Sequence, residues 1–193
     1  MIFFAVYKTE DKSTGDAELV FLIAGGDKKA MKTLVDRYKK RAFYLALGMV
    51  GNKDEAFDIS QEAFIRVFKS AARFERGHEF FPWFYSIVVN LCKDCLARRK
   101  NKEAREMNLD DAAYLLVADS NPEDAVIKEE LSRDVQQALM ELDFEDREII
   151  MLKHFKDLSY DEIAALLKIP KGTVMSRLYY ARKKLVKRLA RYV

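Results

Sequence analysis

Hydroxyl and cationic side chains recur together near the end of the chain, between residues 171 and 184. At helical spacing they share one outer face, which comprises Lys171, Thr173, Ser176, Arg177, Tyr180 and Lys184. Hydroxyls can hydrogen-bond to the edges of bases, and cations can bind phosphates. The pattern favours binding of a duplex through its major groove, and a solvated basic face of an ordinary helical hairpin is the alternative.

Two short helical patterns meet just before this face. Ser159 and Glu162 have the spacing of a capping box, so a helix is expected to begin there. Pro170 cannot continue that helix but suits the first turn of another. Val174 and Leu178 of the second helix would then pack against the first. The spacing therefore predicts a helix-turn-helix.

Other kinds of chemistry have little support in the sequence. There is no glycine-rich phosphate loop and no nucleophile motif, and the two histidines, His78 and His154, lie far apart. Cys92 and Cys95 suit half a zinc site or a redox pair, but no second pair of ligands is visible, and helical cysteines at this spacing are more often packed. We therefore predict no enzymatic activity, no metal and no cofactor.

Charge is distributed unevenly around a net value of +3. The chain is basic and free of acids from residue 171 onward, and a second basic cluster lies between residues 93 and 105. Residues 106–130 are acidic, with Lys128 as the single base. No run approaches the roughly 18 apolar residues of a membrane span, and the first residues do not fit a signal peptide. We expect a cytoplasmic protein without stable membrane insertion.

Helical periodicity continues along the chain, and no alternating strand pattern interrupts it. The periodicity fades between residues 101 and 122, where Asn, Asp, Ser and Pro accumulate. We predict an all-α fold with two helical domains, residues 16–100 and 123–193. A flexible acidic linker over residues 101–122 would join them, and the C-terminal domain would contain the helix-turn-helix.

Both predicted domains resemble one family, the bacterial extracytoplasmic-function sigma factors. Its C-terminal promoter-binding domain is similar to residues 142–189, LDFEDREIIMLKHFKDLSYDEIAALLKIPKGTVMSRLYYARKKLVKRL. Its N-terminal domain is similar to DISQEAFIRVFKSAARF and FFPWFYSIVVNLCKDCLARR, residues 58–74 and 80–99. The resemblance implies a subunit that binds core RNA polymerase and directs promoter-specific initiation, and it makes an anti-sigma factor an expected partner.

The resemblance also implies a polymerase-binding stripe in the first domain. The residues that match the polymerase-facing motif are Asp58, Gln61, Glu62 and Arg66. Because they are three to four residues apart, they would share one face of a helix, as a polar interface between helices requires. A solvated helix surface is the alternative.

By resemblance, the loop RFERGHEFFPW and the helix after it would hold the melted strand of the minus-ten element. Flipped bases need aromatic walls and amide groups, which Phe74, Phe80, Phe81 and Asn90 would supply. Asn90 lies in an otherwise apolar run, where burial would require a partner. The cations expected to hold phosphates are Lys93, Arg98 and Arg99. Trp83 and Phe84 are instead assigned to packing.

The second helix of the helix-turn-helix would contact the minus-thirty-five element as duplex. Family members often carry a basic residue where this chain has Met175 and Tyr180, so a change in the bases recognised is expected. We predict that Ser176, Tyr179 and Tyr180 contact bases, and Thr173 is included in the same surface. The residues expected to contact phosphate are Lys171, Arg177, Arg182 and Lys183.

Two other functions compete with a sigma factor. A homodimeric helix-turn-helix repressor or activator would bind intact duplex DNA, and an enzyme with an appended DNA-binding domain would need a catalytic constellation. The aromatic segment suited to strand capture favours the sigma factor over the first alternative. The lack of a recognisable catalytic motif argues against the second.

Overall fold

The computed structural model describes residues 14–106, 133–156 and 158–192, and all its regular elements are helical. The first half comprises α1 (Asp16–Ala24), α2 (Lys28–Val50), α3 (Lys53–Ser70), the 3-10 helix η1 (Ala71–Arg73) and α4 (Phe80–Glu106). The second half comprises a helical segment at residues 133–140, followed by α6 (Phe144–Lys156), α7 (Tyr160–Leu167) and α8 (Lys171–Leu189). The predicted all-α fold class is confirmed.

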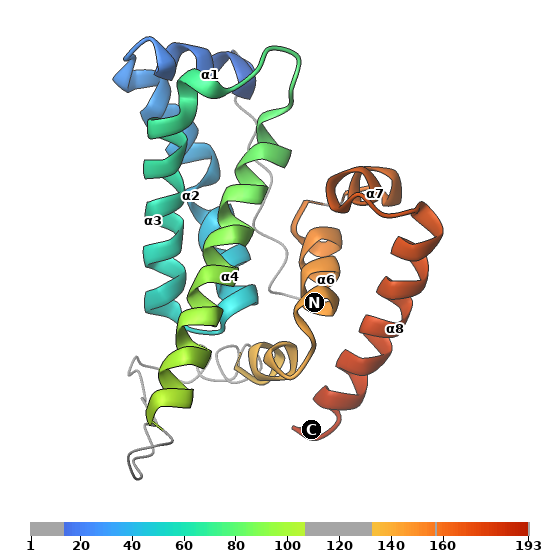
Figure 1. Cartoon of the computed structure of the whole chain (residues 1–193). Coiled ribbons are helices and arrows are strands. Elements are labelled where there is room, and N and C mark those ends of the chain that lie inside the picture. The colour runs from blue at the N-terminus through green and yellow to red at the C-terminus, as the bar shows by residue number, and fades with distance from the viewer. Residues whose placement is uncertain (1–13, 107–132, 157, 193) are drawn as a thin grey trace, which may run out of the picture.

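Local sequence accounts for the turn between α2 and α3. Gly51 ends α2 with φ 77°, a left-handed conformation that glycine adopts without steric cost. The next residue, Asn52, caps α3 because its side-chain oxygen accepts a hydrogen bond from the Glu55 amide at 3.0 Å. These two residues reverse the chain tightly, so α2 and α3 lie side by side (Figure 1).

The core of the first half is aromatic. Tyr38 of α2 packs edge-on against Phe80 and Phe84 of α4, with ring centroids 4.9 Å and 5.6 Å away. Its hydroxyl donates to the Asp16 carboxylate, and Arg37 also binds that carboxylate at 2.8 Å. Burial and this hydrogen bond raise the pKa of Tyr38 well above its ordinary value. The same contacts fix α1 against α2.

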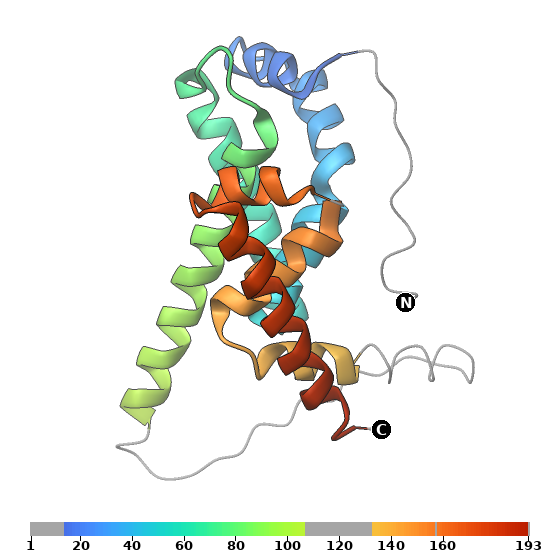
Figure 2. The same cartoon turned by 90° about the vertical axis from the view of Figure 1, so that its right-hand side faces the viewer.

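The two halves pack directly against each other through α6. This helix lies between the N-terminal bundle and α8, as Figures 1 and 2 show from two sides. Gly48 of α2 lies at this contact, where a Cβ atom would require the side chain of Met151 on α6 to shift. The Tyr85 hydroxyl of α4 donates to Glu148 of α6 at 2.7 Å in a buried setting.

Two features bear on the predicted linker. Helix α4 continues to Glu106, six residues past the end predicted for the first domain at residue 100. The rest of the predicted linker, from residue 107 to 122, lies outside the described residues. Its acidic composition remains a fact of the sequence, and its flexibility remains a prediction.

Candidate nucleic-acid interface

The helix-turn-helix is present, and its local interactions are those that the sequence indicates. The Ser159 hydroxyl accepts from the Glu162 amide at 3.2 Å, while the Ser159 amide donates to the Glu162 carboxylate at 2.7 Å. Both halves of the capping box are therefore formed. After α7 the chain turns at Lys168, whose φ of 54° is left-handed, and Pro170 immediately precedes α8. The connection aims α8 across α7.

The inner side of α8 is fixed by apolar packing and by ion pairs. Val174, Leu178 and Ala181 are buried. Lys184 binds Asp146 at 2.6 Å and Asp143 at 3.3 Å, and these hydrogen bonds raise its pKa. The sequence pattern places Lys184 on the outer face, but its ammonium group is held at the start of α6.

The outer face of α8 is exposed. The side chains of Ser176, Tyr179 and Tyr180 are open to solvent, and so is that of Met175. Arg182 and Lys183 are exposed as well and make no ion pair with any residue that the structure describes. This surface thus presents a hydroxyl, aromatic rings and two cations without acidic partners, a combination suited to base edges and phosphates.

Three other predicted residues of this surface are less open. Lys171 is exposed but binds Asp161 of α7 at 2.8 Å, so its ammonium group already has an acidic partner. Thr173 and Arg177 are half-buried. The DNA contacts of all eight residues predicted for this surface stay predictions.

The aromatic residues predicted to hold the melted strand lie in the core. Phe80 is only 2% exposed and stacks on Phe84 at 5.2 Å, and Phe81 is buried as well. Phe74 is buried between Phe21 and Trp83, with ring centroids at 5.6 Å and 5.0 Å. Helical spacing does not distinguish an aromatic ring that faces a base from one that fills the bundle. In this conformation none of the three is presented to a base.

Asn90, in contrast to the three aromatic residues, lies at the surface. The prediction that its apolar neighbours would bury it is wrong. Its side chain is exposed on α4. It therefore needs no internal hydrogen-bonding partner, and its amide is accessible to a ligand. Its contact with a base stays a prediction.

The three basic residues predicted on α4 differ in their surroundings. Arg99 is half-buried, where it binds Glu55 of α3 and donates to the Val50 carbonyl at 3.2 Å. It therefore holds α4 against the α2–α3 turn. Arg98 is exposed. Lys93 is also exposed, but its ammonium group lies 5.2 Å from the ring centroid of Phe144 on α6.

The predicted polymerase-binding stripe lies along α3. Asp58 and Gln61 are exposed, whereas Glu62 and Arg66 are half-exposed and bind each other at 3.3 Å. Beside this stripe three large apolar residues are exposed: Phe57, Ile65 and Phe68. No role was predicted for these three residues from the sequence. Helical spacing could have indicated their exposure, because they lie away from the buried side of α3.

The cysteines of α4 belong to its packed side. Both Cys92 and Cys95 are buried free thiols. Burial, together with the charge of Cys95, raises the pKa of Cys92 to about 12. Among the described residues no cluster of His, Cys, Asp and Glu is suited to a metal ion, and no helix is long and apolar enough to cross a membrane.

Comparison with known proteins assigns a family to each half. Residues 34–102 match Sigma-70 region 2, and residues 132–185 match Sigma-70 region 4. The ECF RNA polymerase sigma factor SigW of Bacillus subtilis is 38% identical over 170 residues, which cover 85% of this chain and 91% of SigW.

Solved structures show the same fold. The structure of CnrH in complex with the cytosolic domain of CnrY aligns with a TM-score of 0.66 at 23% identity, covering 91% of this chain and 97% of that one. The sigma factor RpoE of Bartonella quintana, in complex with the anti-sigma factor NepR, aligns with a TM-score of 0.64 at 22% identity. That alignment covers 84% of this chain and 98% of RpoE.

Proposed function

The chain belongs to the extracytoplasmic-function RNA polymerase sigma factors, and from this premise we propose how its helices divide the work of promoter recognition. A sigma factor gives core RNA polymerase its promoter specificity. The observation that carries the assignment to α8 is its exposed outer face within the region that matches Sigma-70 region 4. The alternative of a homodimeric repressor is not favoured, because the first half matches Sigma-70 region 2.

Helix α8 contacts the minus-thirty-five element as duplex in this proposal. Ser176, Tyr179 and Tyr180 touch base edges because they are exposed on the outer face. Arg182 and Lys183 bind phosphate, since no acid among the described residues neutralises them. Three residues complete the surface: the half-buried Thr173 and Arg177 and the ion-paired Lys171. They need small rotamer changes to reach DNA.

Helix α3 binds core polymerase in this proposal. Its exposed side combines the polar stripe of Asp58, Gln61, Glu62 and Arg66 with the exposed rings of Phe57 and Phe68. Large apolar side chains at a surface are typical of interfaces, and polar groups beside them add specificity. Together they form a surface suited to a helical partner.

Strand capture at the minus-ten element is assigned to α4 and the loop before it. Asn90, Lys93 and Arg98 are exposed and are able to meet a strand first. Phe74, Phe80 and Phe81 are able to stack on bases only after leaving the core. Arg99 contributes mainly by fixing α4, because Glu55 and the Val50 carbonyl already use its guanidinium group.

The expected partners follow from the same assignment. The protein acts with RNA polymerase in the cytoplasm and has no catalytic activity of its own. An anti-sigma factor is a proposed regulator, since one of the solved structures with this fold is a complex with such a factor.

Transcription from defined templates tests the proposed function. Core polymerase should start at a specific promoter only when this protein is added, with a footprint over both elements. Phe68→Glu should abolish binding to core polymerase without unfolding the protein, because Phe68 is 58% exposed. Leu22→Glu, at an exposed apolar residue of α1, is the matched control and should bind normally. Initiation that is independent of the protein would refute the assignment.

A further inference from the structure

We propose that Met175 and Tyr179 recognise the C5-methyl group of a thymine in the upstream promoter element. This inference rests on the proposed contact of α8 with duplex DNA. It deepens that proposal by naming the chemical group that is recognised. The two side chains are 51% and 62% exposed and lie one helical turn apart, so both project from the same side of α8.

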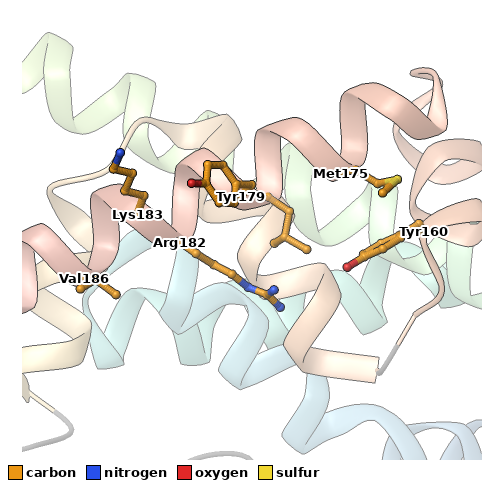
Figure 3. A pocket seen from close by; sticks show the side chains of 7 residues that line it. Tyr160, Met175, Tyr179, Arg182, Lys183 and Val186 are labelled. Atoms are coloured by element: carbon orange, nitrogen blue, oxygen red, sulfur yellow. The ribbon is translucent and has the colours of Figure 1, made fainter.

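The surroundings of Met175 and Tyr179 form an apolar hollow open to solvent. Figure 3 shows that these two side chains and Tyr160 of α7 surround the hollow. Its volume is about 530 Å³, and its lining residues are Tyr160, Met175, Leu178, Tyr179, Arg182, Lys183 and Val186. Most of this lining is apolar side chain.

The chemistry of Met175 restricts what it can recognise. A thioether donates no hydrogen bond and accepts only weakly, so a polar base edge gains little from it. In the major groove the only apolar group on a base-pair edge is the thymine methyl. A basic residue at the same place would prefer guanine, which offers two acceptors. Met175 is therefore suited to thymine and not to guanine.

The cations around the hollow favour DNA over a protein as its ligand. Arg182 and Lys183 line the hollow, and both lack an ion pair with any residue in the described part of the chain. An apolar patch bordered by free cations matches a methyl group that lies between phosphate backbones. A protein partner is the competing explanation, and the experiment below distinguishes the two.

Ser176 supports recognition of the same base pair. Its hydroxyl donates to the Thr173 carbonyl at 3.1 Å within α8. While Ser176 keeps this bond, its oxygen accepts a hydrogen bond from DNA, as from the amino group of adenine or cytosine. An A·T pair presents both an amino group and a methyl group in the major groove. Adjacent residues of α8 thus complement the two groups of one pair.

Replacing thymine by uracil tests the inference, because the change removes only the methyl group. The upstream element is first selected from randomised duplexes with the full chain bound to core polymerase. Each thymine of the selected element is then replaced singly by uracil. We expect affinity to fall about fourfold at one or two positions, the effect of losing one buried methyl group.

The variants assign the effect to a residue. Met175→Ala should retain the fold and bind thymine and uracil duplexes equally at those positions. Val186→Ala is the matched control, because Val186 lines the far end of the hollow and is 67% exposed. It should keep the preference for thymine. If both variants instead weaken the complex with core polymerase and thymine is never preferred, the hollow binds protein and the inference is refuted.

Three further outcomes separate this inference from the proposed function. A selected element in which every thymine-to-uracil change is silent would overturn the role of Met175 and leave the proposed function standing. A failure to select any upstream element would overturn both. Discrimination that persists in Met175→Ala would assign methyl recognition to another residue and would also contradict the inference.

Discussion

The two predicted DNA-binding helices, α8 and α4, present their side chains in opposite ways. On α8, Ser176 and Tyr180 project into solvent. On α4, Phe80 and Phe81 lie in the core, and Lys93 lies over the ring of Phe144 on α6. Exposed side chains are able to contact the edge of an intact duplex as they stand. A pocket for flipped bases must first be opened, so we expect strand capture to require movement.

The position of each helix in the fold explains the difference. Helix α8 lies outside α6, and its single apolar stripe is used on the inner side. Helix α4 is central and packs on two sides, with Phe84 directed toward Tyr38 of α2 and Tyr85 toward Glu148 of α6. A central helix has less free surface for a ligand.

The largest expected effect is loss of stability on truncating the aromatic core. Phe80→Ala should lower the free energy of unfolding by about 3–5 kcal/mol, because the ring is buried and stacked on Phe84. Asn90→Ala, at an exposed site on the same helix, should change it by less than about 0.5 kcal/mol. Urea unfolding measures both. Equal stability of the two variants would mean that Phe80 is not part of the core in solution.

The second prediction concerns the contact that closes α4 against α6. Tyr85→Phe removes the hydroxyl that donates to Glu148 at 2.7 Å and leaves a buried carboxylate unpaired. The free energy of unfolding should fall by about 1.5–3 kcal/mol. The two halves should also separate more readily, which small-angle scattering would detect as a larger radius of gyration.

Tyr192→Phe is the control for this change. Its hydroxyl donates to Glu141 at an exposed site within the second half, so neither stability nor dimensions should change much. If closure opposes strand capture, Tyr85→Phe should also form open complexes faster. An unchanged particle size would show that the Tyr85 contact does not hold the halves together.

A smaller effect is expected from pH at the buried face of α4. Burial, with the charge of Cys95, raises the pKa of Cys92 to about 12. The pKa of a cysteine thiol in the unfolded chain is about 8.5. The folded state therefore keeps a proton that the unfolded state releases, and stability falls as pH rises above the unfolded pKa. Between about pH 7.5 and pH 9.5 Cys92 alone should account for about 1.4 kcal/mol of the loss in stability.

Comparison of pH profiles isolates this contribution. Cys92→Ala should lose stability less steeply over the same pH interval than the unmodified chain, whatever its starting stability. Parallel profiles would mean that the thiol is accessible to water. In that case the packed side of α4 would be more accessible to solvent than the structure shows, and the difference in exposure between α4 and α8 would be smaller.

The smallest expected effect separates two adjacent lysines of α8. Lys183 is exposed without an ion pair among the described residues, whereas Lys184 is held by Asp146 and Asp143. Lys183→Ala should reduce the slope of log affinity against log salt by about one, because one phosphate contact is lost. Lys184→Ala should leave that slope unchanged. Binding titrations at several salt concentrations provide the measurement, and equal slopes for both variants would contradict the assignment.

The sequence by itself determined the helical fold class, the capping box of the helix-turn-helix and the family. Ser159, Glu162 and Pro170 specify the helix-turn-helix because capping and proline effects act within a few residues. The residues assigned to polymerase and promoter binding were identified only through the resemblance to the family, which their short contiguous motifs make recognisable. Their contacts with polymerase and DNA remain predictions.

Only the tertiary structure decided which face of each helix is free. Periodicity shows that Phe80 and Phe84 share a face, but not that Tyr38 of α2 fills the space beside them. It likewise gave no reason to expect Asn90 in solvent or Lys184 on the acids of α6. The reason is that helical spacing fixes the direction of a side chain relative to its own axis. What lies in that direction depends on the packing of residues distant in sequence.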